Sequence, residues 1–146
     1  DDNGNMVDRL KVSENPAKLT IPGIKRVYRI INKDTGMAAG DYIALENEDV
    51  SAEAGIKLFH PTHTYLEKEV KNFEARDLHT DIFINGEQVY DVPTVHESAR
   101  YFKENKELLW NEYLRLLNPE FYPVDLSATC WNNRNAILKR VTKKSN

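Results

Sequence analysis

Residues 6–93 alternate short apolar runs with Gly, Pro, Asn and Asp, a pattern typical of short β-strands joined by turns. Residues 6–13 predict a strand and residues 13–18 a turn, and Pro22-Gly23 predicts a second turn. Residues 24–46 predict a β-hairpin, because strand-like stretches flank the turn-forming residues 33–36. The polar stretch that follows, up to Gly55, reads as a loop with room for one helical turn.

The β pattern continues to residue 93 with one ambiguous stretch. Residues 56–61 predict a strand that Pro61 stops. In residues 65–76 the apolar positions approximate helical spacing, yet the alternating charges fit an edge strand. Residues 79–93 predict a second hairpin around Asn85-Gly86, because both residues tolerate positive φ.

The last third of the chain has helical patterning. Thr94 and Glu97 have the spacing of a capping box, which predicts a helix start. Apolar residues then follow one helical stripe up to Asn118-Pro119, namely Ala99, Phe102, Leu108, Leu109, Tyr113 and Leu116. Asp125 or Ser127 can cap a final helix, which ends in cations that suit a helix C-terminus.

Strands first and helices last predict an α+β fold, with a small antiparallel sheet or open barrel followed by two C-terminal helices. We expect both helices to cover one side of the sheet. Residues 1–146 are expected to be one domain, mainly β over 1–93 and mainly α over 94–146.

The start of the chain carries a tight-turn signal, Asp2-Asn3-Gly4-Asn5. A hairpin turn needs a strand on each side, and residues 6–13 supply only the second. We therefore expect the chain to be the C-terminal piece of a larger protein. A disordered natural N-terminus is the alternative.

Composition narrows the class of protein. With 40% hydrophobic and 29% charged residues, the chain can bury a core. The net charge is −3, and Lys and Arg are scattered, so we expect no nucleic-acid partner and no membrane surface. No run of about 20 apolar residues predicts a membrane span. The single cysteine, Cys130, excludes an internal disulfide and fits a reducing cytoplasm.

The first candidate for chemistry is FHPTHTYLEKEV, which contains His60 and His63. Together with the distant His79, these residues could form a metal site or supply a catalytic base. The spacing of the pair is unspecific, so we interpret both histidines as the end of a strand. We expect Cys130 to be a buried, inert thiol.

Two charged groups are further candidates. Glu67, Glu69, Glu74 and Asp77 resemble a set of paired carboxylates, but cations alternate with them, which favours a solvated face. The densest basic cluster is Lys11, Lys18, Lys25, Arg26 and Arg29. These cations either guard an edge strand or meet an acidic domain or a phosphate. No glycine-rich phosphate loop is visible in the sequence.

Residues 11–30, KVSENPAKLTIPGIKRVYRI, resemble the segment that follows the catalytic barrel in nicotinate phosphoribosyltransferases. The family pattern is close to K-x-S-E-N-P-x-K-x-T-x-P-G-x-K-x-V-Y-R. The residues that fit it are Lys11, Ser13, Glu14, Asn15, Pro16, Lys18, Thr20, Pro22, Gly23, Lys25, Val27, Tyr28 and Arg29. GDYIALE, FHPTHT, IFINGEQVYDVPTVHESARYF and LLNPEFYPVDLS resemble later family segments in the same order.

The resemblance implies that the chain is the C-terminal domain of a larger phosphoribosyltransferase. Enzymes of this family join nicotinate to phosphoribosyl pyrophosphate, giving nicotinate mononucleotide and pyrophosphate in NAD salvage. The reaction is coupled to ATP hydrolysis and assisted by Mg²⁺, and the enzymes are commonly cytoplasmic homodimers.

In the family, the phosphorylated histidine and the phosphate-binding residues lie on the barrel, and His60 and His63 match a different motif. The resemblance therefore implies no catalytic, substrate-binding or metal-binding residue in this chain, and no cofactor bound by it. We expect the chain to buttress its own catalytic barrel through residues 6–31 and to be inactive alone.

Two alternatives belong to other classes of protein. One is a stand-alone β-rich binding module that recognises a peptide or small ligand at a sheet edge. The other is a metal-dependent hydrolase that uses His60, His63 and His79.

Overall fold

The computed structural model describes all residues except 1–2, 6–9, 12, 14–17, 62 and 144–146. Residues 3–5 of the predicted turn at the start of the chain are described, and they bend at Asn3 and Gly4, with a φ of 77° at Gly4. The strand and turn predicted over residues 6–18 lie largely outside the described residues. Leu10, Lys11 and Ser13, which are described, belong to no strand. The bend at Pro22-Gly23 is confirmed, and Gly23 adopts a φ of 93°.

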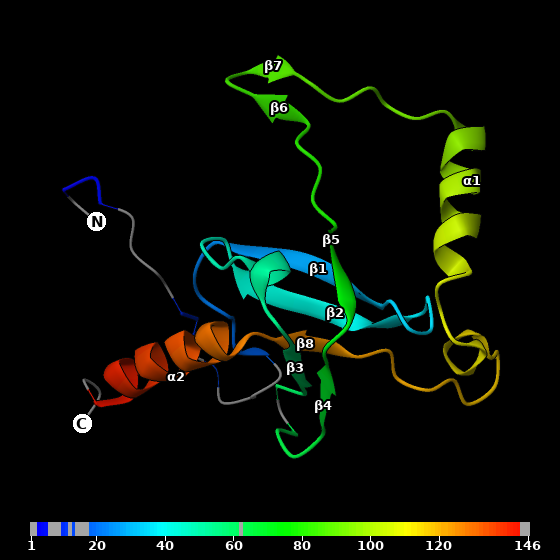
Figure 1. The fold of residues 1–146 in the computed structure, drawn as a ribbon. Helices are drawn as coiled ribbons and strands as arrows, with labels where there is room; N and C mark the ends of the chain where they lie inside the picture. The colour runs from blue at the N-terminus through cyan, green and yellow to red at the C-terminus, as the bar shows by residue number, and fades with distance from the viewer. Residues whose placement is uncertain (1–2, 6–9, 12, 14–17, 62, 144–146) are drawn as a thin grey trace.

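The centre of the molecule is a four-stranded sheet in the order β5-β1-β2-β8 (Figure 1). Its strands are β1 (Lys25–Asn32), β2 (Ala38–Leu45), β5 (Phe73–Asp77) and β8 (Val124–Leu126). The predicted hairpin is confirmed as β1 and β2, which pair antiparallel around the turn. The sheet is mixed and not purely antiparallel, because β8 runs parallel to β2. β8 was not predicted, since a strand of three residues has no periodicity to detect.

A second, two-stranded sheet consists of β3 (Ile56–Phe59) and β4 (Glu67–Val70). The predicted helical turn before it is the 3₁₀ helix η2 (Val50–Ala52). Residues 65–76, which fitted either a helix or a strand, form β4 and β5. The core lies between the sheets and is built from fully buried residues, including Ile30, Ala44, Val50, Ile56, Leu58 and Val70.

Residues 79–107, which we call the arm, leave the core at the end of β5 and return beside the β1–β2 turn (Figure 1). The arm carries β6 (Phe83–Ile84), β7 (Glu87–Gln88) and α1 (Val95–Lys106). The hairpin around Asn85-Gly86 is confirmed, with φ of 50° and 87° at these residues. The capping box of Thr94 and Glu97 is confirmed as well.

The prediction of one long helix up to residue 118 is wrong. α1 ends at Lys106, and a separate 3₁₀ helix, η3 (Asn111–Leu114), follows. The backbone O of Leu108 instead accepts the N–H of Ala38 at 2.8 Å, which ties the chain to β2. α1 has no buried residue, so the prediction that both helices cover the sheet is also wrong.

The last helix, α2 (Ala128–Lys143), packs close to β2. Ser127 is its cap, because Ser127 Oγ accepts the N–H of Cys130 at 2.9 Å. The other predicted cap, Asp125, lies within β8. The predicted α+β fold class is confirmed. Among the described residues, neither helix combines the length and apolar composition that a membrane span requires.

Candidate functional site

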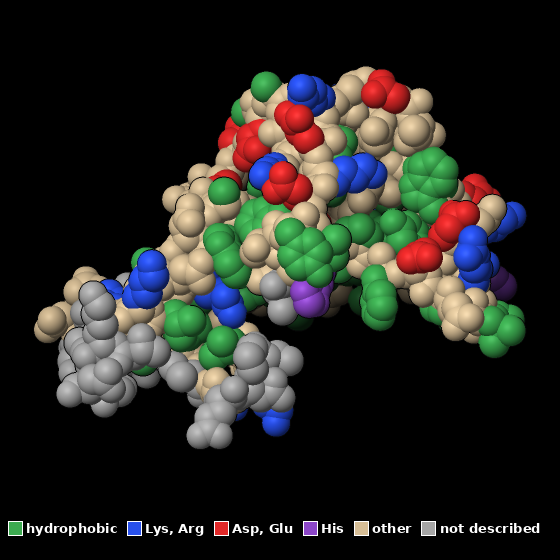
Figure 2. Space-filling view, turned by 90° about the horizontal axis from the view of Figure 1, so that it is seen from below, with side chains coloured by type: hydrophobic (Ala, Val, Ile, Leu, Met, Phe, Trp, Pro, Cys, Tyr) green, Lys and Arg blue, Asp and Glu red, His purple; other side chains and the backbone are tan. Residues whose placement is uncertain are grey.

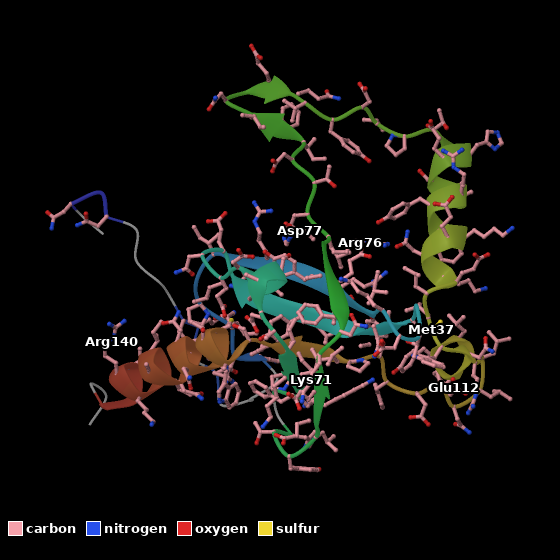
Figure 3. The ribbon with its side chains drawn as sticks, viewed as in Figure 1. Met37, Lys71, Arg76, Asp77, Glu112 and Arg140 are labelled. Carbon is pink, nitrogen blue, oxygen red and sulfur yellow. The ribbon has the colours of Figure 1, made fainter. Side chains whose placement is uncertain are left out.

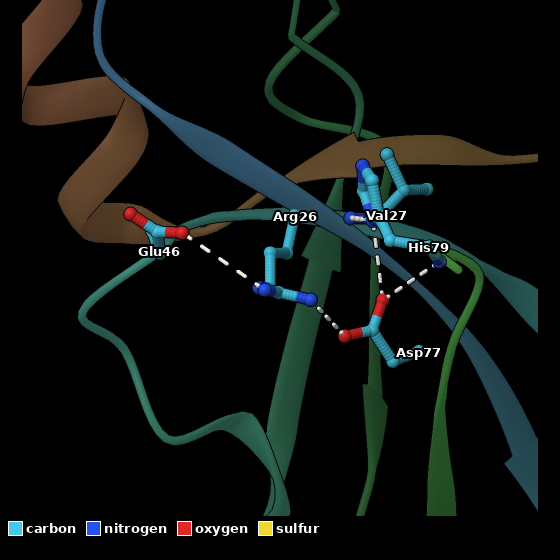
Figure 4. Close-up of polar contacts among 5 residues, drawn as sticks. All are labelled: Arg26, Val27, Glu46, Asp77 and His79. Carbon is cyan, nitrogen blue, oxygen red and sulfur yellow. Dashed lines mark hydrogen bonds and ion pairs between the residues drawn. The ribbon is translucent and has the colours of Figure 1, made fainter. Parts of the chain in front are cut away.

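A polar network joins the ends of β1 and β5 (Figure 4). Arg26 Nη1 donates to Asp77 Oδ2 at 2.8 Å, and Arg26 Nη2 lies 3.9 Å from Glu46 Oε1. Asp77 Oδ1 accepts the backbone N–H of His79 at 2.9 Å and lies 3.1 Å from His79 Nδ1. The backbone N–H of Val27 donates to the same ring nitrogen at 3.3 Å. The network holds the end of β5 against β1, at the position of Arg76 and Asp77 in Figure 3, where the chain leaves the sheet.

The ring of His79 can satisfy only one of its two Nδ1 contacts at a time. Nδ1 must be unprotonated to accept from Val27, and it must carry a proton to donate to Asp77. Partial burial by itself would raise the pKa of Asp77, but hydrogen bonds from the His79 backbone and from Arg26 lower it. Asp77 is therefore ionised at neutral pH, and the network acts as a structural clamp.

A second polar cluster joins the two central strands to the segment before β8. Arg29 and Asp41 form a two-pronged ion pair, with N–O distances of 3.0 and 3.2 Å. The hydroxyl of Tyr122 donates to the same carboxylate at 2.9 Å. Burial, and next the charge of Asp41, raise the pKa of Tyr122, which keeps this hydroxyl a proton donor. Tyr113 packs edge-on against Tyr122, with ring centroids 5.3 Å apart.

A cleft of ≈ 430 Å³ opens between the β3–β4 pair and the segment that enters β8. Its lining mixes apolar side chains with His60, Lys68 and Asp125. Burial raises the pKa of Asp125, and the electrostatic interaction with His60 partly offsets this rise. Figure 2 views this end of the molecule and shows hydrophobic side chains gathered around a histidine. Phe121, which also lines the cleft, is 96% exposed, so the cleft opens onto an apolar surface.

His60 and His63 lie directly after β3, the position predicted for them. Nδ1 of His60 accepts the backbone N–H of His63 at 3.0 Å, and the two rings lie 5.0 Å apart. Backbone bonds from His60 to Leu66 and from Leu66 to His63 close the turn. The geometry fits a structural strand end, and the role of the two histidines stays a prediction.

The structure does not assemble the predicted metal set. His79 belongs to the network at the end of β5, whereas His60 and His63 belong to the β3–β4 turn. Throughout the described part of the chain, no three His, Cys, Asp or Glu side chains are placed to hold a metal ion. The geometry that the metal-hydrolase alternative requires is therefore not seen.

The remaining candidates are paired or buried. Cys130 is fully buried in α2, as predicted, and burial raises the pKa of its thiol. The candidate carboxylates each pair with a cation: Glu67 with Lys57, Glu69 with Lys71, Glu74 with Arg76 and Asp77 with Arg26. These pairs form a charged, solvent-facing surface.

The basic cluster does not guard an edge strand, because β1 lies inside the sheet. Lys25 donates to the backbone oxygens of Ile21 and Gly23, while Arg26 and Arg29 face carboxylates of this same chain. Sequence reasoning did not identify Asp41 or Tyr122 as site residues, and it considered Asp125 only as a helix cap. Tyr122 and Asp41 are 81 positions apart, and no local pattern relates residues at that separation.

The fold is thus an α+β domain in which Arg26 and Arg29 of β1 pair with carboxylates of the same chain. The family model described as nicotinate phosphoribosyltransferase C-terminal domain matches residues 24–134. The chain therefore belongs to this family.

Known proteins agree with the family match. Nicotinate phosphoribosyltransferase of Bacillus subtilis (strain 168) is 48% identical over 144 residues, covering 99% of this chain and 29% of that protein. The protein of the same name from Caenorhabditis elegans is 31% identical over 121 residues, covering 82% of this chain and 21% of its own length. The chain thus spans less than a third of the length of these relatives.

A solved structure shares the fold. The crystal structure of human nicotinic acid phosphoribosyltransferase aligns with a TM-score of 0.71 at 24% identity. The alignment covers 82% of this chain and 24% of the human chain. At this identity, the likeness concerns the fold alone.

Proposed function

We propose that this chain is the C-terminal domain of a nicotinate phosphoribosyltransferase. The parent enzyme joins nicotinate to phosphoribosyl pyrophosphate, coupled to ATP hydrolysis, and releases nicotinate mononucleotide and pyrophosphate in NAD salvage. The observation that carries the proposal is the match over residues 24–134, together with 48% identity to the Bacillus subtilis enzyme. The parent is a cytoplasmic homodimer that acts without nucleic acid or membrane.

Within the parent, this domain has a structural role and buttresses the catalytic barrel. The ion pairs of Arg26 with Asp77 and of Arg29 with Asp41 support this role, because each pair satisfies its charges within the domain. A catalytic centre needs polar groups aimed at a substrate position. Arg26 and Arg29 are instead directed at carboxylates of this same domain.

ATP and Mg²⁺ belong to the rest of the parent enzyme. A Mg²⁺ site uses carboxylate and other oxygen ligands, whereas the carboxylates of Asp41 and Asp77 are engaged by arginines. The sequence of this domain also has no glycine-rich phosphate loop. No step of the reaction is assigned to these residues.

The test compares residues 1–146 with the full-length parent protein. Each is incubated with nicotinate, phosphoribosyl pyrophosphate, ATP and Mg²⁺, and nicotinate mononucleotide is measured by chromatography. We expect product from the full-length protein and none from residues 1–146. Turnover by residues 1–146 alone would refute the structural role. A folded full-length protein that makes no product would refute the proposed activity.

A further inference from the structure

The arm, residues 79–107, has no core of its own. Every residue in it is exposed except Tyr90 and Asn105, which are half-buried. Backbone bonds tie it to the sheet at each end, from Leu78 N to Val27 O at 2.9 Å and from Ala38 N to Leu108 O at 2.8 Å. Between these ties the chain stands away from the sheet (Figure 1). The arm is therefore positioned by the domain without being packed against it.

The arm also carries a concentration of apolar side chains. Phe83 is 63% exposed and Phe102 is 67% exposed. The other large apolar residues exposed along the arm are Ile82, Ile84, Val89, Val92, Val95 and Tyr101. Exposed apolar side chains concentrated along one segment in this way mark a contact site for another protein surface.

The elements of the arm need a partner surface for stability. The β6–β7 hairpin has two residues in each strand, and a two-stranded hairpin alone is marginally stable in water. α1 has 12 residues, and an isolated helix of this length is also marginal. Both elements become stable when their apolar side chains pack against another surface.

Length and charge indicate which surface this is. The family match runs through the whole arm, so the arm is part of the shared domain. The Bacillus subtilis relative has most of its length outside the matched region, which supplies a body for the arm to contact. The arm has six Asp and Glu against three Lys and Arg, so two copies packed arm against arm would bring like charges together.

We propose that the arm is a surface by which this domain packs against the remainder of its parent polypeptide. The surface it meets is apolar at its centre and basic at its rim. This contact rests on the proposed function and adds to the seam expected over residues 6–31. It assigns to the β6–β7 hairpin and α1 a contact with the rest of the parent that is separate from that seam.

Hydrogen exchange of the full-length parent protein and of residues 1–146 tests the contact. We expect arm amides to exchange at least about tenfold more slowly in the full-length protein, with β1 and β2 protected in both. Equal exchange of the arm in the two proteins would overturn the proposal. Arm protection in residues 1–146 that rises with protein concentration would overturn it in favour of a second copy of this domain.

A double variant in the full-length protein, Phe83→Ser with Phe102→Ser, gives a second test. It should remove the protection of the arm, while the melting temperature of residues 1–146 stays unchanged because both side chains are already exposed there. Tyr65→Ser is the matched control, an exposed aromatic residue outside the arm. Unchanged arm protection in the double variant would contradict the proposal.

The same preparations separate this inference from the proposed function. A full-length protein with a protected arm and no nicotinate mononucleotide synthesis would retain the contact and refute the activity. An active protein with an unprotected arm would refute the contact and retain the activity.

Discussion

Asp77 is the residue on which most of the contacts at the end of β5 converge. It receives hydrogen bonds from Arg26 and from the backbone of His79, and both lower its pKa. The side chain is 35% exposed, so solvent screens the pair. Its contribution is to hold β1 and β5 together at the point where the arm begins.

Asp77→Asn should lower the free energy of unfolding at pH 7. Because the pKa of Asp77 is lowered in the folded protein, its stabilising effect is complete above the ordinary aspartate value of about 3.9. The effect is lost as the pH falls through the folded value, so wild type and variant should converge in acid. Urea unfolding at a series of pH values measures this difference.

Asp81→Asn is the control, since Asp81 is an exposed carboxylate on the arm. It should leave the unfolding free energy close to wild type at pH 7. A deficit of Asp77→Asn that stays constant from pH 7 down to strong acid would contradict the role assigned to the ionised carboxylate.

At the scale of elements, the join between β2 and β8 depends on a close backbone approach at Gly40. A Cβ at this position would lie 3.0 Å from Pro123 Cβ and 3.1 Å from the Pro123 carbonyl oxygen. The next residue, Asp41, donates its N–H to that same carbonyl at 2.9 Å. A side chain at Gly40 would therefore push away the segment that leads into β8.

Gly40→Ala should destabilise the chain by about 1–3 kcal/mol, the usual cost of overpacking. Gly55→Ala is the matched control, because a Cβ there makes ordinary contact, 3.5 Å from Lys71 Cγ. It should change stability by about 0.5 kcal/mol or less. Urea denaturation midpoints of the two variants measure this difference. Equal midpoints would show that Pro123 moves away from a Cβ at Gly40 without a measurable loss of stability.

At the scale of the whole molecule, the chain divides into a packed part and an uncovered part. The two sheets enclose the buried core, whereas the arm and η3 contain no buried residue. A groove of ≈ 720 Å³ runs along the end of α1 and η3, with Met37 and Glu112 among its lining residues (Figure 3). Local stability should therefore differ sharply between the core and the arm.

Limited trypsin digestion of residues 1–146 should cut first after Arg100, Lys103 or Lys106. These sites lie on α1, which has no buried residue, and opening there costs little free energy. Cuts after Arg26 and Arg29 should come later, because β1 lies inside the sheet. Mass spectrometry of early fragments checks the order, and early cleavage within β1 would contradict it. A variant with Gln at the three α1 sites should lose the early fragments.

Local signals in the sequence were sufficient where a few adjacent residues decide the conformation. Asn85-Gly86 predicts its turn because both residues accept positive φ, and Thr94 with Glu97 predicts the start of α1 because the two groups cap each other. The stretch around Leu66 and Val70 was undecided, because its spacing fits two structures. Pairing with β3 settled it as a strand.

The sequence by itself determined the class of fold, most element positions and the family, since all of these follow from short-range patterns and a long run of family residues. The tertiary structure alone decided that β8 pairs with β2, that Tyr122 reaches Asp41, and that the apolar residues of α1 are left unburied by the part of the chain that the structure describes. The physical reason is the separation along the chain of the residues that interact. Turns and caps depend on neighbouring residues, whereas sheet order and burial depend on contacts between residues far apart in the chain.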